Sequence, residues 1–122
     1  MSKIPSDEAF ARAERMMAED FRGLADVSNV INSRCKEFPW FKRFYIIPQG
    51  DNGFRAYFFF RKDTDLIACK ADGTTTAIEE SVYEGLEQVG RGKRGEIVVA
   101  FEWDSDENVQ RVFDGDYFRR LS

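Results

Sequence analysis

The chain has 122 residues, of which 43% are hydrophobic and 33% are charged, and its formal net charge is −4. This size and composition predict one globular domain over residues 1–122, and no apolar run approaches the roughly 18 residues of a membrane-spanning helix. Histidine is absent, which excludes Ser-His-Asp and Cys-His catalytic systems and histidine metal ligands.

Two amphipathic helices are predicted at the N-terminal end. Ser6 is a suitable N-cap with acidic residues after it, and residues 7–21 carry apolar side chains at helical spacing. Gly23 is a plausible stop. A second helix is expected at about 26–37, ended by Pro39. The alternative is one long helix bent at Gly23.

The pattern then changes to that of strands. Residues 41–47 are rich in aromatic and β-branched side chains, and residues 54–60 are mostly aromatic, with Phe54, Ala56, Phe58 and Phe60 on one face of a predicted strand; a Gly-Asn-Asp-rich turn separates the two segments. A third strand is predicted from Leu66 to Lys70, bounded by Asp72 and Gly73. The short connections predict an antiparallel meander.

The second half is predicted to alternate between helix and hairpin. Thr76 and Glu79 have the spacing of a capping box, which predicts a helix with an apolar stripe. A strand is expected from Glu96 to Trp103, followed by a turn at 104–108 and a hairpin partner at 109–113. The last segment, 117–121, is a short element that could be strand or helix.

These elements predict an α+β fold with the order α-α-β-β-β-α-β-β. The sheet would be antiparallel, with about five strands, and helices would pack on it. The strand at 54–60 is expected to be central, with one face covered by helices and the other partly by a loop or a partner.

Cysteine usage indicates the cellular compartment. Only Cys35 and Cys69 occur, too few for a disulfide framework or for a metal site built from cysteine alone. Both lie among apolar residues, which predicts buried, reduced thiols and a cytoplasmic protein. We expect no cofactor and no metal.

A glycine motif in the sequence has the residue spacing of a dinucleotide-binding pattern. Gly90, Gly92 and Gly95 satisfy Gly-x-Gly-x-x-Gly. A dinucleotide site needs this loop to follow a strand and to open a helix, whereas here it follows a helix and precedes a strand. The motif is therefore interpreted as a helix end and a turn.

The segment at 104–108, Asp-Ser-Asp-Glu-Asn, begins like a calcium-binding loop. The sixth position of such a loop must be glycine and is Val109, and the twelfth should be glutamate and is Gly115. A polar turn explains the same residues. Acid–base chemistry by Asp114 and Asp116 is a further alternative, but a catalytic carboxylate needs burial or a close like charge, and turn carboxylates are usually exposed.

Charge is distributed unevenly along the chain. Residues 1–62 have a net charge of +3 and residues 63–116 a net charge of −9. An acidic half disfavours a nucleic-acid backbone and favours a basic partner. The aromatic strand at 53–60 resembles the base-stacking strand of RNA-recognition domains, but it lacks their spacing, so we expect no nucleic-acid binding.

The C-terminal two-thirds resembles a known family. An aromatic strand at 53–60, an acidic helix, the strand Ile-Val-Val-Ala-Phe-Glu-Trp and the segment Phe-Asp-Gly-Asp-Tyr-Phe at 113–118 are similar to the YezG-like immunity proteins. These proteins neutralise the toxic domains of bacterial polymorphic toxins and belong with the immunity proteins of contact-dependent inhibition systems. The resemblance implies a non-enzymatic protein that binds a toxin.

The predicted function is therefore toxin neutralisation. The chain would occlude the active site of a cognate toxin domain, a basic nuclease fitting best, and would be a monomer or a weak dimer. The residues expected to contact the partner are Asp104, Asp106, Glu107, Asp114, Asp116 and Tyr117. Two alternatives stay open: an acidic secretion chaperone that holds an effector segment against its sheet, and a hydrolase that uses carboxylates.

Overall fold

Three strands form one sheet in residues 7–122, the part of the chain that the computed structural model describes. They are β1 (Phe41–Pro48), β2 (Gly53–Phe60) and β3 (Val98–Ser105), in the spatial order β1-β2-β3. β1 pairs with β2 in antiparallel fashion, whereas β2 and β3 are parallel. The fold is α+β as predicted, but the sheet is mixed and three-stranded, so the prediction of about five antiparallel strands is wrong.

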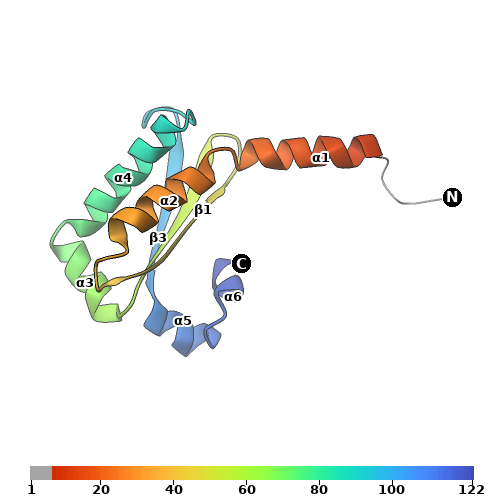
Figure 1. Ribbon diagram of the computed structural model, residues 1–122. Helices are drawn as coiled ribbons and strands as arrows, with labels where there is room; N and C mark the ends of the chain where they lie inside the picture. Colours follow the sequence, from red (N-terminus) through yellow and green to blue (C-terminus); the bar gives the residue numbers. More distant parts are fainter. Residues whose placement is uncertain (1–6) are drawn as a thin grey trace.

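Helices precede, link and follow the strands (Figure 1). α1 (Asp7–Asp20) and α2 (Leu24–Cys35) confirm the two predicted N-terminal helices, although the proposed cap Ser6 lies outside the described residues. The other helices are α3 (Asp63–Ala71), α4 (Thr74–Gln88), α5 (Asp106–Phe113) and α6 (Tyr117–Leu121). α3 and α4 form the crossover that lets β3 run parallel to β2.

The predicted third strand is the helix α3. In a strand, Ile67 and Cys69 would share a face, yet Ile67 is 68% exposed and Cys69 is buried at 4%. Acidic residues in the first turn, Asp63 and Asp65, and Lys70 in the last turn complement the helix dipole. The prediction of a strand is therefore wrong: the short apolar run has acidic residues before it and a lysine at its end, which is the charge pattern of a helix.

The predicted hairpin at 104–113 is also wrong, because α5 occupies it. Ser105 caps this helix, and Asp106 and Glu107 fill its first turn. The same Ser-Asp-Glu pattern that predicts the first helix at residue 6 was present here. α4 begins at Thr74 after Gly73, earlier than the predicted capping box at Thr76.

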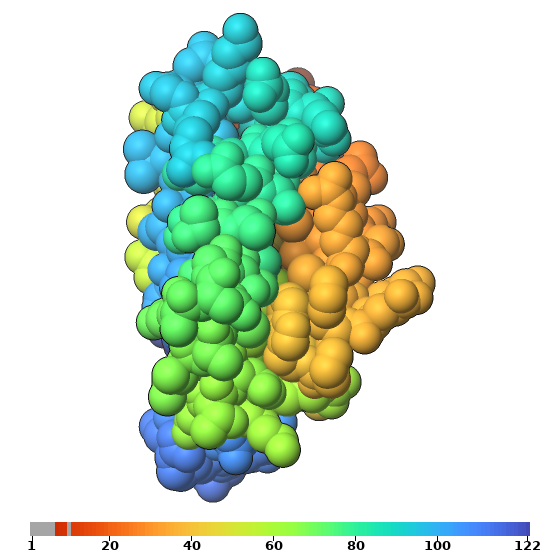
Figure 2. Space-filling model, turned by 90° about the vertical axis from the view of Figure 1, so that its left-hand side faces the viewer, coloured from red at the N-terminus to blue at the C-terminus, as the bar shows by residue number. Residues whose placement is uncertain are grey.

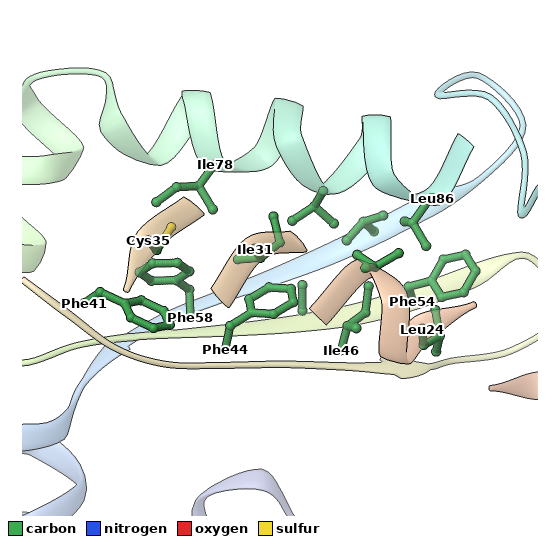
Figure 3. Close-up of a cluster of buried hydrophobic side chains, with 14 of the residues drawn as sticks. Leu24, Ile31, Cys35, Phe41, Phe44, Ile46, Phe54, Phe58, Ile78 and Leu86 are labelled. Atoms are coloured by element: carbon green, nitrogen blue, oxygen red, sulfur yellow. The ribbon is translucent and has the colours of Figure 1, made fainter. Parts of the chain in front are cut away.

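One face of the sheet carries the main core (Figure 3). The side chains of Phe54, Ala56, Phe58 and Phe60 pack against α2 and α4, and Gly85 of α4 allows close contact with Val27 of α2. Cys35 and Cys69 are free and buried, as predicted. Burial raises the pKa of the Cys35 thiol to about 11, so the thiol stays protonated and unreactive.

The opposite face carries a second, smaller core. Tyr57, Phe59 and Val109 are buried there, with Tyr45, Phe113, Tyr117 and Leu121 packed around them. α5 and α6 supply this cover, so β2 is buried on both faces. The prediction that β2 is central and that helices cover one of its faces is confirmed, but the helices α5 and α6, not a loop or a partner, cover the other face.

The described residues contain no helix that is long and apolar enough to cross a membrane. In the space-filling view, α4 and α2 lie side by side, and α5 is at the lower end of the molecule (Figure 2).

Candidate partner-binding surface

The predicted contact residues lie where β3 runs into α5 and α6. Ser105, the last residue of β3, is fully buried, and its Oγ accepts a hydrogen bond of 3.0 Å from the backbone N–H of Asn108. The same hydroxyl donates to Asp63 at the start of α3. One hydroxyl therefore fixes the beginnings of two helices.

α3 and α5 are joined by further contacts at this corner. Glu107 accepts a hydrogen bond of 2.7 Å from the backbone N–H of Asp63, and Arg111 pairs with the Asp63 carboxylate at 3.3 Å. The hydrogen bond from Ser105, supported by the Arg111 guanidinium, lowers the pKa of Asp63. Glu107 of α5 thus caps the first turn of α3, and Asp63 is held in its charged form.

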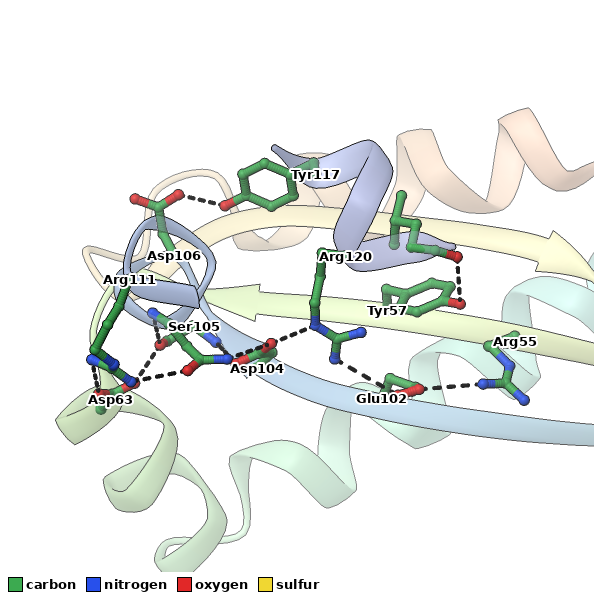
Figure 4. Close-up of polar contacts among 12 residues, drawn as sticks. Arg55, Tyr57, Asp63, Glu102, Asp104, Ser105, Asp106, Arg111, Tyr117 and Arg120 are labelled. Carbon is green, nitrogen blue, oxygen red and sulfur yellow. Dashed lines mark hydrogen bonds and ion pairs between the residues drawn. The ribbon is translucent and has the colours of Figure 1, made fainter. Parts of the chain in front are cut away.

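A chain of alternating charges crosses the second face of the sheet (Figure 4). Arg120 of α6 lies 2.6 Å from Asp104 and 3.7 Å from Glu102, both on β3. Glu102 also pairs with Arg55 of β2 at 3.3 Å. Asp104 and Arg120 are only 13% and 17% exposed. These contacts clamp the C-terminal helix to the sheet.

Tyr117 is half-buried, which contradicts the expectation that its side chain is exposed. Its ring packs edge-on against Phe59, with 4.9 Å between the centroids, and Arg43 lies over the ring at 4.6 Å. Its hydroxyl donates a hydrogen bond to Asp106. Burial, followed by the neighbouring Asp106 carboxylate, raises the pKa of Tyr117 well above its ordinary value. This tyrosine is a structural anchor.

The remaining predicted residues face solvent. Glu107, Asp114 and Asp116 are exposed, and so are two apolar side chains, Val112 at 56% and Phe118 at 87%. Asp114 ends α5 with a positive φ of 53° and Asp116 caps α6 through the backbone N–H of Arg119. We call these five side chains, Glu107, Val112, Asp114, Asp116 and Phe118, the outer surface of α5–α6.

The six predicted contact residues thus divide into two groups. Asp104, Asp106 and Tyr117 make hydrogen bonds and ring contacts within the fold. Glu107, Asp114 and Asp116 are exposed on the outer surface of α5–α6, although Glu107 and Asp116 also accept backbone hydrogen bonds at the starts of α3 and α6.

Sequence reasoning missed the partners that hold these acids, above all Ser105, Asp63 and Arg120. For Ser105 a local signal was present, because serine before Asp-Glu is typical of a helix start. No local pattern pairs Arg120 with Asp104, since the two residues meet only after α6 folds back over the sheet.

The calcium-like segment at 104–108 spans the junction of β3 and α5. Within residues 7–122, no group of three or more acidic, cysteine or histidine side chains is placed to hold a metal ion. The loop at 90–95 lies between α4 and β3, as predicted, which is the reverse of the order that a dinucleotide site needs.

Comparisons with family models, with curated proteins and with solved structures found no match to this chain.

Proposed function

We propose that this protein is a non-catalytic immunity protein that binds a cognate bacterial toxin domain and covers its active site, and that the toxin is a basic nuclease. One observation carries the proposal: the outer surface of α5–α6 places an aromatic side chain, Phe118, that is 87% exposed among exposed carboxylates. An aromatic residue surrounded by charge is the composition of interface hot spots.

The charge of the second half of the chain fits a basic partner. Residues 63–116 have a net charge of −9, and three of their acids, Glu107, Asp114 and Asp116, lie on the outer surface of α5–α6, with Arg119 of α6 exposed beside them. A nuclease needs a positive surface to bind the phosphate backbone, so an acidic inhibitor is attracted to the same surface. Electrostatic steering raises association rates from about 10⁵–10⁶ to about 10⁸–10⁹ M⁻¹s⁻¹.

The surface is also held in a fixed conformation before any partner arrives. Arg120 clamps α6 to β3, Ser105 and Asp63 join α5 to α3, and Tyr117 fills the core beneath. A surface fixed in this way loses little conformational entropy on binding. Asp104, Asp106 and Tyr117 therefore serve binding indirectly, by positioning Asp114, Asp116 and Phe118.

The chaperone alternative has less support. Such a protein would hold an effector segment against its sheet, but the central part of each sheet face is covered by the chain's own helices. A peptide would have to displace α5 and α6 or add to the edge of the sheet.

Growth rescue tests the proposal. The reading frame immediately upstream is expected to encode a large secreted protein with a toxic C-terminal tail. Inducing that tail alone should stop bacterial growth, and co-expression of this chain should restore it. The Phe118→Ala variant should rescue less well, while Ile67→Ala, which truncates an exposed apolar side chain of α3 outside the outer surface of α5–α6, should rescue as the wild type does. Rescue that is equal for both variants would contradict the proposed surface.

A further inference from the structure

Helix α1 projects from the body of the protein, and no other element of the described part of the chain lies along it (Figure 1). Met16 and Met17 are 63% and 62% exposed, and Phe21 just beyond the helix is 49% exposed. An isolated helix of 14 residues is only marginally stable in water, because helical stability in proteins comes mostly from a packed apolar face. This helix therefore needs a surface to cover it.

The base of α1 is held firmly to the body. The guanidinium of Arg91 donates hydrogen bonds to the carbonyl oxygens of Asp20 and Arg22, at 2.9 and 2.8 Å. Gly23, with a φ of 79°, lies so close to Val89 that a Cβ there would be 2.7 Å from the valine side chain. These contacts fix the direction in which α1 leaves the body.

The same chain has an unfilled apolar groove between α2 and α4. Its volume is about 340 Å³. Phe38 and Trp40 form one wall, with their rings stacked 4.7 Å apart, and Phe38 is 48% exposed. The other lining residues are Ile31, Arg34, Cys35, Thr74, Ala77, Ile78 and Ser81. Methionine thioethers pack favourably against aromatic rings of this kind.

The charges of helix and groove are complementary. α1 carries five acidic and two basic residues. Glu14 and Asp20 each lie three residues from Met17, so they flank it on the helix surface. Arg34 is the one charged residue among those that line the groove; it donates a hydrogen bond of 3.0 Å to Ser81 and lies 3.9 Å from Glu84, and about half of its side chain stays exposed to a further carboxylate. A carboxylate beside Met17 would meet this guanidinium when the methionine enters the groove.

The groove of the same molecule is not a suitable acceptor for its own α1. To reach it, α1 would fold back along the outward side of α2, where Ala25, Asp26, Asn29 and Ser33 are exposed. These side chains are small or polar and offer no apolar stripe. The fold-back would also break the hydrogen bonds from Arg91.

The lengths of α1 and α2 allow two molecules to place each α1 in the groove of the other. α1 is about 21 Å long and α2 about 18 Å, from 14 and 12 residues at 1.5 Å each. α1 leaves from the N-terminal end of α2 (Figure 1), and Phe38 and Trp40 follow the C-terminal end of α2, so α1 and the groove lie at opposite ends of α2. Two molecules side by side in antiparallel orientation bring each α1 to the other's groove, which closes as a two-fold dimer.

We propose that the protein forms a two-fold dimer in which the α1 arm of each copy, through Met16 and Met17, occupies the α2–α4 groove of the other. This inference does not depend on toxin binding, because arm and groove lie apart from the outer surface of α5–α6.

Sedimentation velocity over a wide range of protein concentration tests the dimer. The wild type should dimerise, and Met16→Glu/Met17→Glu should weaken the dimer by about a hundredfold, as for removal of an interface hot spot. The control Arg15→Glu changes the charge of the same helix equally but on the side away from Met17, so it should stay dimeric. A monomeric wild type, or a methionine variant that dimerises as the wild type does, would overturn the proposal.

Mixing a groove variant with the α1 variant tests whether α1 of one copy binds the groove of the other. Ala77→Arg, or Phe38→Ser as a second groove variant, should be monomeric alone with unchanged circular dichroism. An equal mixture of the groove variant with Met16→Glu/Met17→Glu retains one intact arm and one intact groove per pair, so heterodimers should form. A mixture that stays monomeric would show that the arm binds elsewhere and would refute the exchange.

Discussion

Replacing Asp104 by asparagine keeps the shape of the side chain but removes the charge that faces Arg120. The two groups are 2.6 Å apart and only 13% and 17% exposed, so water replaces the lost interaction poorly. Asp104 also accepts a hydrogen bond of 3.2 Å from Asn108. The substitution therefore weakens the attachment of both α6 and α5.

The expected loss in the free energy of unfolding is about 2 kcal/mol. Hydrogen bonds to charged groups contribute about 1.5–3 kcal/mol each. Arg120 keeps a second carboxylate, Glu102, at 3.7 Å, so its charge is not left without a partner and the loss stays below that of a fully broken buried pair. The unfolding entropy of a domain of this size is roughly 0.26 kcal/mol per degree, so Tm should fall by about 8 °C.

Urea unfolding monitored by tryptophan fluorescence measures this loss. Asp114→Asn is the matched control, because Asp114 is an exposed acid in the same segment, and asparagine tolerates its positive φ. The control should change stability by less than about 0.5 kcal/mol. In a double-mutant cycle with Arg120→Met, the coupling energy should be about 1–2 kcal/mol. Equal stability of Asp104→Asn and Asp114→Asn would refute the idea that the ion pair clamps α6.

Two further perturbations probe the same attachment. Tyr117→Phe keeps the ring but removes the hydroxyl that bonds to Asp106, and thermal unfolding should show a loss of about 1 kcal/mol; no loss would mean that the hydroxyl is equally well satisfied by water. The folded-state pKa of Asp63 is lowered, by Ser105 first and by Arg111, so Asp63 stabilises the fold above its unfolded pKa and this stabilisation disappears as the pH falls through the folded value. Stability measured against pH should therefore decline less steeply on the acid side in Asp63→Asn than in the wild type, and parallel curves would contradict the assignment.

The longer elements were predictable because their local patterns agree with their surroundings. α1, α2 and α4 have helical apolar stripes, β1 combines aromatic and β-branched residues, β2 is mostly aromatic, and a turn lies between the two strands. The alternation of side chains between the two faces of β2 could also be predicted from the sequence. Phe58 and Tyr57 point to opposite faces, and both faces are covered. Burial on both faces is typical of a central strand.

The short helices α3 and α5 were not predicted, since their apolar residues are too few to separate a period of 3.6 from a period of 2. Ile67 and Cys69 look alike in sequence, and only tertiary packing buries one and exposes the other. The error at α3 hid the crossover, and the parallel pairing of β2 with β3 was lost with it. End signals such as Ser105 followed by two acids were the better evidence.

The candidate site was predictable as a region but not in its division of roles. Composition pointed to the acidic C-terminal segment, and Asp114 and Asp116 are indeed exposed there. Composition does not reveal that Asp104 faces Arg120 or that Tyr117 packs on Phe59, because these contacts depend on α6 returning to the sheet.

The most direct test of the account is the association rate of this protein with the toxin domain, measured by stopped flow at several salt concentrations. Asp114→Asn/Asp116→Asn removes two exposed charges while asparagine preserves the helix cap, and we expect association roughly tenfold slower with a weaker dependence on salt. The control Asp26→Asn/Asp51→Asn removes two exposed charges elsewhere and should leave the rate nearly unchanged. If both pairs of substitutions gave the wild-type rate and salt dependence, the outer surface of α5–α6 would not be where the partner binds.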